Sequence, residues 1–223
     1  MTQLPAGVLW DMDGTIVDTE PYWFAAQTDL VAAFGGTWTF EDGLTLVGSG
    51  LWHSAAVLQD RGVEMDSDAI VELLSDRVLE RVNERVPWRP GARQLLSELR
   101  SAGIPTALVT MSIRRMAEHI ASVIPFDAFD AVIAGDDGGH AKPHPEPYLR
   151  GAAALGVEIG DCVAFEDSST GLAAAVASGA VSIGVPLHNP LAEGLGYEIW
   201  PTLEGRTLAD VAAHFAIARR QIA

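Results

Sequence analysis

A short apolar run followed at once by two aspartates and a glycine is the feature that most limits what this chain can fold into. Residues 7–10 form the apolar run, which is typical of a buried strand in a parallel sheet. Because alternate side chains of a strand point to one face, Asp11 and Asp13 begin on the same side. Gly14 then allows a sharp turn. Such carboxylates lie where open α/β sheets bind ligands, although an Asp-Gly turn that only closes a strand is the alternative.

Polar side chains also follow three later apolar runs, at residues 106–109, 131–134 and 162–165. These side chains are Thr110, Lys142 (some residues after its run), Glu166 and Asp167. The carboxyl ends of parallel strands converge on one edge, so we expect these groups to meet Asp11 and Asp13 there. A carboxylate nucleophile, a carboxylic acid, anion donors and oxygen ligands for Mg²⁺ together suit phosphoryl transfer.

These residues, in this order, carry a resemblance to a known family. The segments that carry it are Asp11-Met12-Asp13-Gly14-Thr15, the hydroxyl of Thr110, Lys142-Pro143, and Glu166-Asp167-Ser168 with Gly171. They resemble the four motifs of the haloacid dehalogenase-like hydrolases, and most of all the branch of phosphatases and β-phosphoglucomutases. The resemblance implies a Rossmann-like core, a parallel sheet covered by helices on both faces, formed by residues 1–17 and 88–223. It also implies an inserted four-helix cap domain formed by residues 18–87.

The resemblance implies a role for each matching residue. Asp11 corresponds to the nucleophile that forms an aspartyl-phosphate, and Asp13 to the general acid and base. Lys142 would bridge the nucleophile and the transferring phosphoryl group. Thr110 would donate its hydroxyl to the phosphate, and Met111 would offer its backbone N–H.

Four acidic residues are candidate ligands for Mg²⁺. Asp11, the carbonyl of Asp13, Asp167 and Glu166 offer the oxygen ligands that this hard cation prefers, with Glu166 binding directly or through water. An acidic helix cap is the alternative interpretation of Glu166 and Asp167, since Ser168 and Ser169 follow them.

Lys142 is the only lysine, and the other thirteen of the fourteen Lys and Arg residues are arginine. A single lysine in such a chain indicates a position that needs the compact point charge of an ammonium rather than the planar, forked guanidinium of arginine. We assign no chemical role to the neighbouring His140 and His144, because adjacent loop histidines are usually solvated. Two further acidic residues follow the third apolar run, Asp136 and Asp137. They either support Lys142 or the metal from behind the residues that bind directly, or belong to a solvated loop.

The segment between Asp18 and Pro87 has a helical pattern. Helices are expected at residues 20–34, 41–47, 51–61 and 67–86, with Ser67 as a cap for the last. Trp23, Trp52 and His53 lie at positions of this insertion that can face the cleft, and they are candidate substrate-binding residues. A tryptophan in a helical insertion also commonly belongs to the core.

Helices and strands alternate after Pro90, which predicts a parallel sheet with helices on both faces. The expected helices cover residues 91–102, 112–124, 145–155, 169–178 and 208–218. Two further strands are expected at residues 181–185 and 197–200, the second at an edge.

Composition limits the partners of the protein. The 223 residues are 48% hydrophobic, enough for a real core, and carry a formal net charge of −16. Such a chain should repel nucleic acid and anionic lipid, so neither nucleic acid nor membrane is an expected partner. The only cysteine, Cys162, is expected to be a buried structural thiol. We find no secretory signal and no apolar run of the ~18 residues that a membrane span needs, so the cytoplasm is the expected compartment.

The hypothesis that follows is a Mg²⁺-dependent phosphatase that acts on a small phosphorylated metabolite. A mutase of the β-phosphoglucomutase type is the first alternative, but Trp23 stands where such relatives use histidine, Leu51 near where they use arginine, and the insertion has no lysine. The missing lysine also disfavours a phosphonate hydrolase, and Asp13 disfavours a dehalogenase. A non-catalytic domain that binds a phosphorylated ligand is the alternative from another class. The sequence does not name the substrate or the oligomeric state.

Overall fold

A six-stranded sheet forms the centre of the computed structural model, which describes residues 3–222. Its strands are β1 (Gly7–Trp10), β2 (Thr106–Val109), β3 (Ala131–Ile133), β4 (Cys162–Glu166), β5 (Val181–Gly184) and β6 (Tyr197–Ile199). Neighbouring strands run parallel in the order β3-β2-β1-β4-β5-β6. The chain therefore adds β2 and β3 on one side of β1 and then crosses to the other side for β4. The predicted α/β fold with a parallel sheet is confirmed, and the point where the order reverses lies beside β1.

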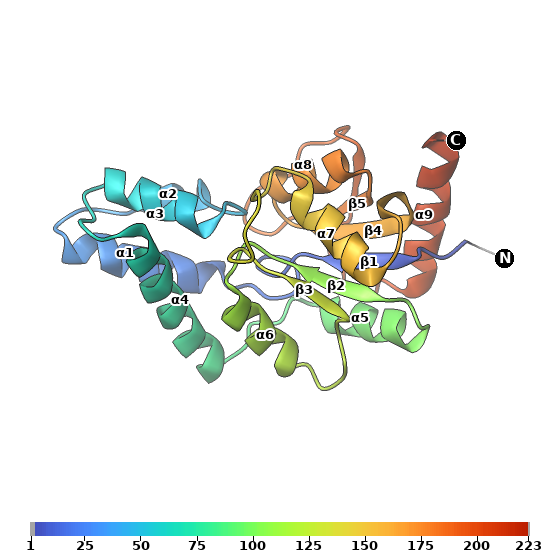
Figure 1. Cartoon of the computed structure of the whole chain (residues 1–223), viewed down its shortest axis with the longest axis horizontal. Coiled ribbons are helices and arrows are strands. Elements are labelled where there is room, and N and C mark those ends of the chain that lie inside the picture. Colours follow the sequence, from blue (N-terminus) through green and yellow to red (C-terminus); the bar gives the residue numbers. More distant parts are fainter. Residues whose placement is uncertain (1–2, 223) are drawn as a thin grey trace.

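Helices cover both faces of the sheet (Figure 1). The helices α5 (Ala92–Ser101), α6 (Arg114–Ser122) and α9 (Leu208–Ile222) contribute to one apolar cluster together with Trp10 and Phe165. The helices α7 (Glu146–Leu155) and α8 (Ser169–Ser178) contribute to the other together with Leu9 and Ala164. Neighbouring residues of one strand thus point into different clusters, as the alternation of a strand requires. A short 3₁₀ helix, η1 (Ile159–Asp161), leads into β4.

The helical insertion expected after the first strand is present. It consists of α1 (Glu20–Ala33), α2 (Phe40–Leu44), α3 (Leu51–Asp60) and α4 (Ser67–Glu84), which we call the helical group. Figure 1 shows this group at one end of the molecule, while both termini lie at the other end. The long α4 packs against α1 and α3 through one face that buries Ile70, Leu74 and Val78.

Helix boundaries differ from the sequence-based expectation where side chains compete for the first turn. Ser67 does not cap α4, because Asp66 accepts the backbone N–H of Asp68 instead. The helix expected from Ser112 begins only at Arg114, since the Ser112 N–H donates to the Thr110 hydroxyl and its own hydroxyl reaches the site described below.

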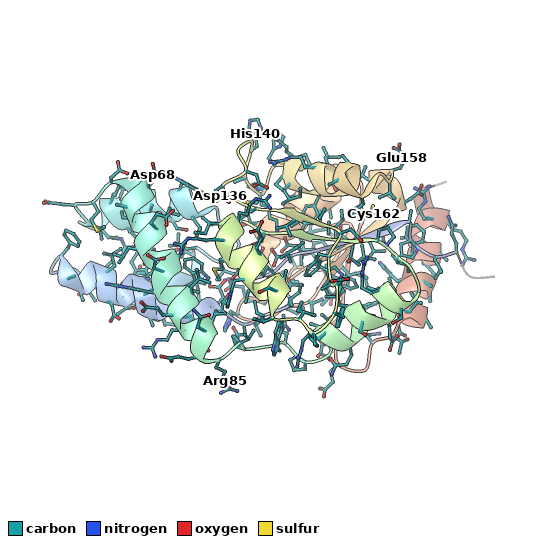
Figure 2. All side chains as sticks on the ribbon, turned by 60° about the horizontal axis from the view of Figure 1, so that its bottom comes forward. Asp68, Arg85, Asp136, His140, Glu158 and Cys162 are labelled. Atoms are coloured by element: carbon teal, nitrogen blue, oxygen red, sulfur yellow. The ribbon has the colours of Figure 1, made fainter. Side chains whose placement is uncertain are left out.

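Cys162 lies on β4 within the fold (Figure 2) and is fully buried. Burial, with a smaller contribution from Asp161, raises the pKa of this thiol to about 12, so it stays neutral. The expectation of an inert structural thiol agrees with this environment. Among the described helices, none combines the length and the apolar character that spanning a bilayer requires.

Candidate active site

The loop after β1 places two carboxylates at the carboxyl edge of the sheet. Asp11 is anchored by its backbone N–H, which donates to the carbonyl of Phe165 on the neighbouring strand β4 at 3.0 Å. Gly14 follows with φ +83° and lies directly against the Asp167 carboxylate. Any side chain at Gly14 would overlap that carboxylate and would also be strained at this φ, so glycine is required by both space and backbone conformation.

The ammonium of Lys142 is buried between two carboxylates. Its Nζ lies 2.7 Å from Asp11 Oδ1, 2.5 Å from Glu166 Oε1 and 2.9 Å from the carbonyl of Val109. Three N–H donors therefore meet three acceptors. Burial alone favours the neutral amine, but the charges of Asp11 and Glu166 outweigh it and raise the pKa of Lys142 above its usual value. The only lysine of the chain is thus a permanently charged group beside Asp11.

Asp11 carries one satisfied and one unsatisfied oxygen. Lys142 holds Oδ1, while Oδ2 is buried without a hydrogen-bond partner among the described residues. Burial and the neighbouring Glu166 raise the pKa of Asp11 to about 7, although Lys142 opposes this shift. A buried polar atom without a partner is rare, and it marks Oδ2 as the atom aimed at a ligand.

Three buried carboxylates lie close enough together to hold a metal ion. Oxygen atoms of Asp11, Glu166 and Asp167 all lie within 4.8 Å of one another. Burial, and then repulsion from Asp11 and Glu166, raises the pKa of Asp167 well above its usual range. Crowded carboxylates and an unpartnered oxygen are what a hard divalent cation would stabilise, so the donor set fits Mg²⁺.

Glu166 is held by a residue that the sequence analysis missed. The Tyr148 hydroxyl donates to Glu166 Oε1 at 2.5 Å, and the Ser168 hydroxyl donates to Oε2 at 3.2 Å. Tyr148 is fully buried in the first turn of α7, six positions after Lys142. The position of Tyr148 shortly after Lys142-Pro143 was the available sequence signal that it lies near the site. This spacing does not show which side of a helix faces the sheet.

Asp13 is surrounded by hydrogen-bond donors. The Ser112 hydroxyl lies 2.7 Å and the Thr110 hydroxyl 3.3 Å from Oδ2, while Thr19 and the Trp23 indole N–H reach Oδ1. Thr110 thus lines the site as expected, but here its hydroxyl contacts Asp13. Ser112 and Thr19 were not identified from the sequence, because their contacts depend on how two loops turn.

A cleft lies between these groups and the helical group. Its walls include Asp11, Asp13, Thr110, Met111, Lys142 and Asp167 from the sheet edge, and Glu20, Trp23 and Gln27 from α1. The buried Glu20 was missed, because an acidic residue in a first helical turn usually serves the helix itself. Burial, followed by the charges of Asp13, Asp11 and Asp18, raises the pKa of Glu20 to about 8.

Trp52 and His53 line a neighbouring cavity rather than this cleft. That cavity also contacts Met111, Lys142 and His140. The Trp52 indole N–H donates to Asp68 at 2.7 Å, and the residue stays 39% exposed. The structure therefore brings Trp23 to the carboxylates and separates Trp52 and His53 from them, and their substrate-binding role stays a prediction.

One buried arginine ties the loops around the site together. Arg89 donates to the carbonyls of Gly14, Val185 and Pro186, from the segments that follow β1 and β5. Sequence analysis gave no indication of this role, since Arg89 lies between a tryptophan and a proline in the connection back to the core.

Comparison with known proteins identifies relatives along most of the chain. Residues 5–179 match the family described as haloacid dehalogenase-like hydrolase. Hexitol phosphatase B of Escherichia coli is 31% identical over 186 residues, which cover 80% of this chain and 82% of the relative. The Escherichia coli fructose-1-phosphate phosphatase YqaB is 32% identical over 186 residues, covering 82% and 97%.

Solved structures with the same fold cover almost the whole chain. CbbY from Rhodobacter sphaeroides, in a complex with xylulose-(1,5)bisphosphate, superposes with a TM-score of 0.83 at 25% identity, covering 93% of this chain and 99% of that one. A β-phosphoglucomutase from Clostridium difficile superposes with a TM-score of 0.84 at 21% identity, covering 98% and 99%. The second likeness concerns the fold alone.

Proposed function

Because the chain belongs to the haloacid dehalogenase-like hydrolases, as its motifs indicated, we propose that it is a phosphoric monoester hydrolase acting on a phosphorylated carbohydrate. The observation that carries the proposal is the buried contact between Lys142 and Asp11, which holds one oxygen of that carboxylate and leaves the other without a partner in the described part of the chain. The names of the relatives, which are phosphatases of hexitol and fructose phosphates, support the substrate class.

In the first chemical step, Asp11 Oδ2 attacks phosphorus. A bond forms between this oxygen and phosphorus while the bond from phosphorus to the sugar oxygen breaks, and Asp13 gives its proton to that leaving oxygen. Lys142, fixed against Oδ1, neutralises charge on Asp11 and on the phosphoryl oxygens. The product is an aspartyl-phosphate and a free alcohol.

In the second step, water attacks the phosphorus of the aspartyl-phosphate. Asp13 now accepts a proton from that water, the bond between phosphorus and Oδ2 breaks, and inorganic phosphate and the Asp11 carboxylate are released. Asp13 thus returns to its starting protonation state. The donors around Asp13, Ser112 and Thr110 above all, support it by fixing its orientation during both transfers.

We further propose that Mg²⁺ is the cofactor, held by Asp11, Asp167, the Asp13 carbonyl and Glu166. When bound, this cation neutralises phosphate charge and the repulsion among the carboxylates. The fit rests on the three clustered carboxylates of Asp11, Glu166 and Asp167. Since Glu166 already accepts from Lys142 and Tyr148, its part includes holding Lys142 in place.

Residues 18–87 are proposed to act as a cap over residues 1–17 and 88–223. This division is supported by the place of the helical group over the sheet edge and by the cleft walls that α1 contributes. A cap of this kind excludes water during the first step and opens for product release. Glu20, Trp23 and Gln27 are the cap residues proposed to meet the substrate.

A phosphate-release assay tests the proposal. An aryl phosphate and a panel of hexose and hexitol phosphates should each be offered with and without Mg²⁺, and we expect Mg²⁺-dependent release of phosphate. Isomerised sugar phosphate without phosphate release would support the mutase alternative. Phosphate-ester binding without any turnover would support the non-catalytic alternative.

A further inference from the structure

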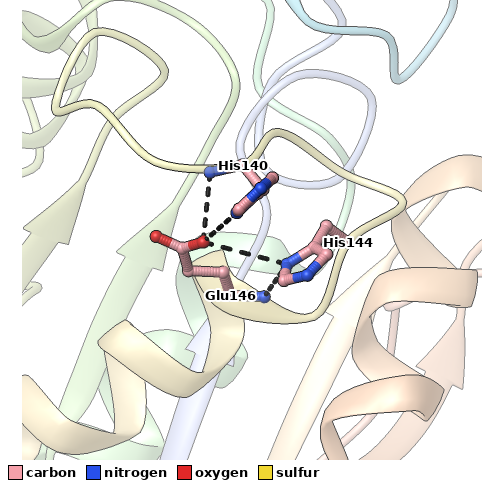
Figure 3. A group of neighbouring side chains, drawn as sticks. All are labelled: His140, His144 and Glu146. Atoms are coloured by element: carbon pink, nitrogen blue, oxygen red, sulfur yellow. Dashed lines mark hydrogen bonds and ion pairs between the residues drawn. The ribbon is translucent and has the colours of Figure 1, made fainter.

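Two histidines and a glutamate gather on the loop that leads from β3 into α7. His140 Nδ1 lies 2.6 Å from Glu146 Oε2, and His144 Nδ1 lies 3.9 Å from the same oxygen. Figure 3 shows both imidazoles directed toward this carboxylate, and their ring centroids are 4.3 Å apart. Figure 2 shows His140 at the outer surface of the molecule, so the group is separate from the buried carboxylates.

The hydrogen bonds of this group define which atoms can bind a ligand. The backbone N–H of Glu146 donates to His144 Nδ1 at 3.2 Å, so this nitrogen is unprotonated. The contact between His140 Nδ1 and the Glu146 carboxylate needs a proton on Nδ1, because an ionised carboxylate only accepts. The site thus offers one carboxylate and two imidazoles, and a metal bound at either Nδ1 would replace the hydrogen bond that this nitrogen makes to Glu146.

We propose that His140, His144 and Glu146 form a second metal site, which binds Zn²⁺ or another borderline divalent transition metal. Ligand atoms of all three lie within 4.8 Å of one another. Neighbouring ligands of a tetrahedral zinc lie about 3.3 Å apart at metal–ligand distances near 2.0 Å, so rotations of exposed side chains are enough to close the shell. Their side chains are 71%, 49% and 31% exposed, which leaves access for the metal and for a water as fourth ligand.

The chemistry of the donors separates the two metal sites. Imidazole nitrogen suits zinc, nickel and copper, whereas the all-oxygen set of Asp11, Glu166 and Asp167 suits magnesium. Zinc bound at His140 Nδ1 would replace the hydrogen bond from this nitrogen to Glu146, and the ring proton would then stand on Nε2. Lys142 lies between the two histidines in the sequence, so the metal would tie the loop together on both sides of the buried lysine.

Zinc binding to the Mg²⁺-saturated protein tests the proposal. Zinc is titrated in competition with a chromogenic chelator, and wild type is compared with the His140→Ala/His144→Ala double variant and with His119→Ala as an imidazole control. We expect wild type and the control to bind one zinc that the double variant lacks. Removing both histidines should lower zinc affinity by more than the roughly 10–100-fold seen when a residue that only hydrogen-bonds a metal ligand is removed. Circular dichroism checks that the double variant is folded. The Glu146→Gln variant, which replaces the third ligand by a group of similar size, should also bind zinc more weakly.

A further readout is specific to the proposed ligands. Co²⁺ in place of Zn²⁺ should give visible absorption bands of a nitrogen-ligated site in wild type but not in the double variant. Equal zinc affinity and stoichiometry in wild type and the double variant would overturn the proposal. Zinc binding that is retained in the double variant but lost in the Asp167→Asn variant would also overturn it.

Discussion

The indole N–H of Trp23 lies 3.4 Å from Asp13 Oδ1, so the first helix of the helical group touches the second carboxylate of the sheet edge. This contact joins the proposed cap to the proposed general acid. It also places a hydrogen-bond donor of the cap within the cleft.

Trp23→Phe should lower turnover modestly, because it keeps the ring but removes the donor to Asp13. An ordinary hydrogen bond contributes about 0.5–1.5 kcal/mol, so kcat/KM should fall by roughly 2- to 10-fold. Trp88→Phe, a change at a tryptophan outside the cleft, is the control. Equal kinetics for wild type and the Phe variant would show that the contact does not serve the reaction.

Lys142→Arg should remove most of the activity although it conserves the charge. The Lys142 side chain is 1% exposed and meets three acceptors at 2.5–2.9 Å, which leaves no room for a longer, planar guanidinium. A displacement of about 1 Å in such a site can cost ~10²-fold. The check is kcat/KM at saturating Mg²⁺, with the exposed Arg81 changed to Lys as the control. Equal kcat/KM for the Arg variant and wild type would show that Lys142 has no role in the reaction.

Asp11→Asn should abolish phosphate release while the fold persists. The amide cannot attack phosphorus, but it fills the same space, and it removes a charge that burial and Glu166 disfavour. Thermal unfolding followed by circular dichroism should therefore show a stable protein. Turnover near that of wild type in the purified variant would exclude Asp11 as the nucleophile.

Asp167→Ala should raise the Mg²⁺ concentration that gives half-maximal activity more than it raises KM for the substrate. The reason is that Asp167 supplies a carboxylate oxygen to the proposed metal cluster. Activity titrated against Mg²⁺ measures the effect, and Asp60→Ala on the exposed end of α3 provides the control. An unchanged Mg²⁺ requirement would mean that Asp167 is not a ligand.

Asp137→Asn should destabilise the protein near neutral pH and much less in acid. Burial opposes ionisation of Asp137, but hydrogen bonds from Ala134 and Arg114 outweigh it and lower its pKa in the folded state. A lowered pKa adds stability above the unfolded value of about 3.9, and this stability is lost as pH falls through the folded pKa. Urea unfolding of both proteins at about pH 7 and about pH 3.5 should show the difference shrinking. An equal difference in unfolding free energy at both pH values would show that the effect does not come from the ion pair between Asp137 and Arg114.

The sequence allowed prediction of the strands and of the residues that end them, because those signals are local. Asp11, Lys142 and Asp167 each follow an apolar run, and a parallel sheet brings such positions to one edge. Contacts that depend on the direction of a loop or the rotation of a helix carry no local signal. Ser112 reaches Asp13 only because the chain turns back after Thr110, and Tyr148 faces Glu166 only through the rotation of α7.

Helix ends show the same limit on a smaller scale. Ser67 and Asp66 are both good caps by composition, and the backbone path decides that Asp66 takes the role. Trp52 and Trp23 were equal candidates for the cleft, and only the packing of α3 against α4 directs Trp52 to Asp68 instead.

The contact between Lys142 and Asp11 joins residues 131 positions apart, and Glu166 follows 24 positions later. No early part of the chain therefore contains the complete set of charges. A chain that ends before β4 lacks Glu166, so Lys142 has only one of its two carboxylate partners and the proposed site is incomplete. Activity regained during refolding should accordingly require β4 to dock beside β1, so regained turnover reports that this central pair of strands has formed.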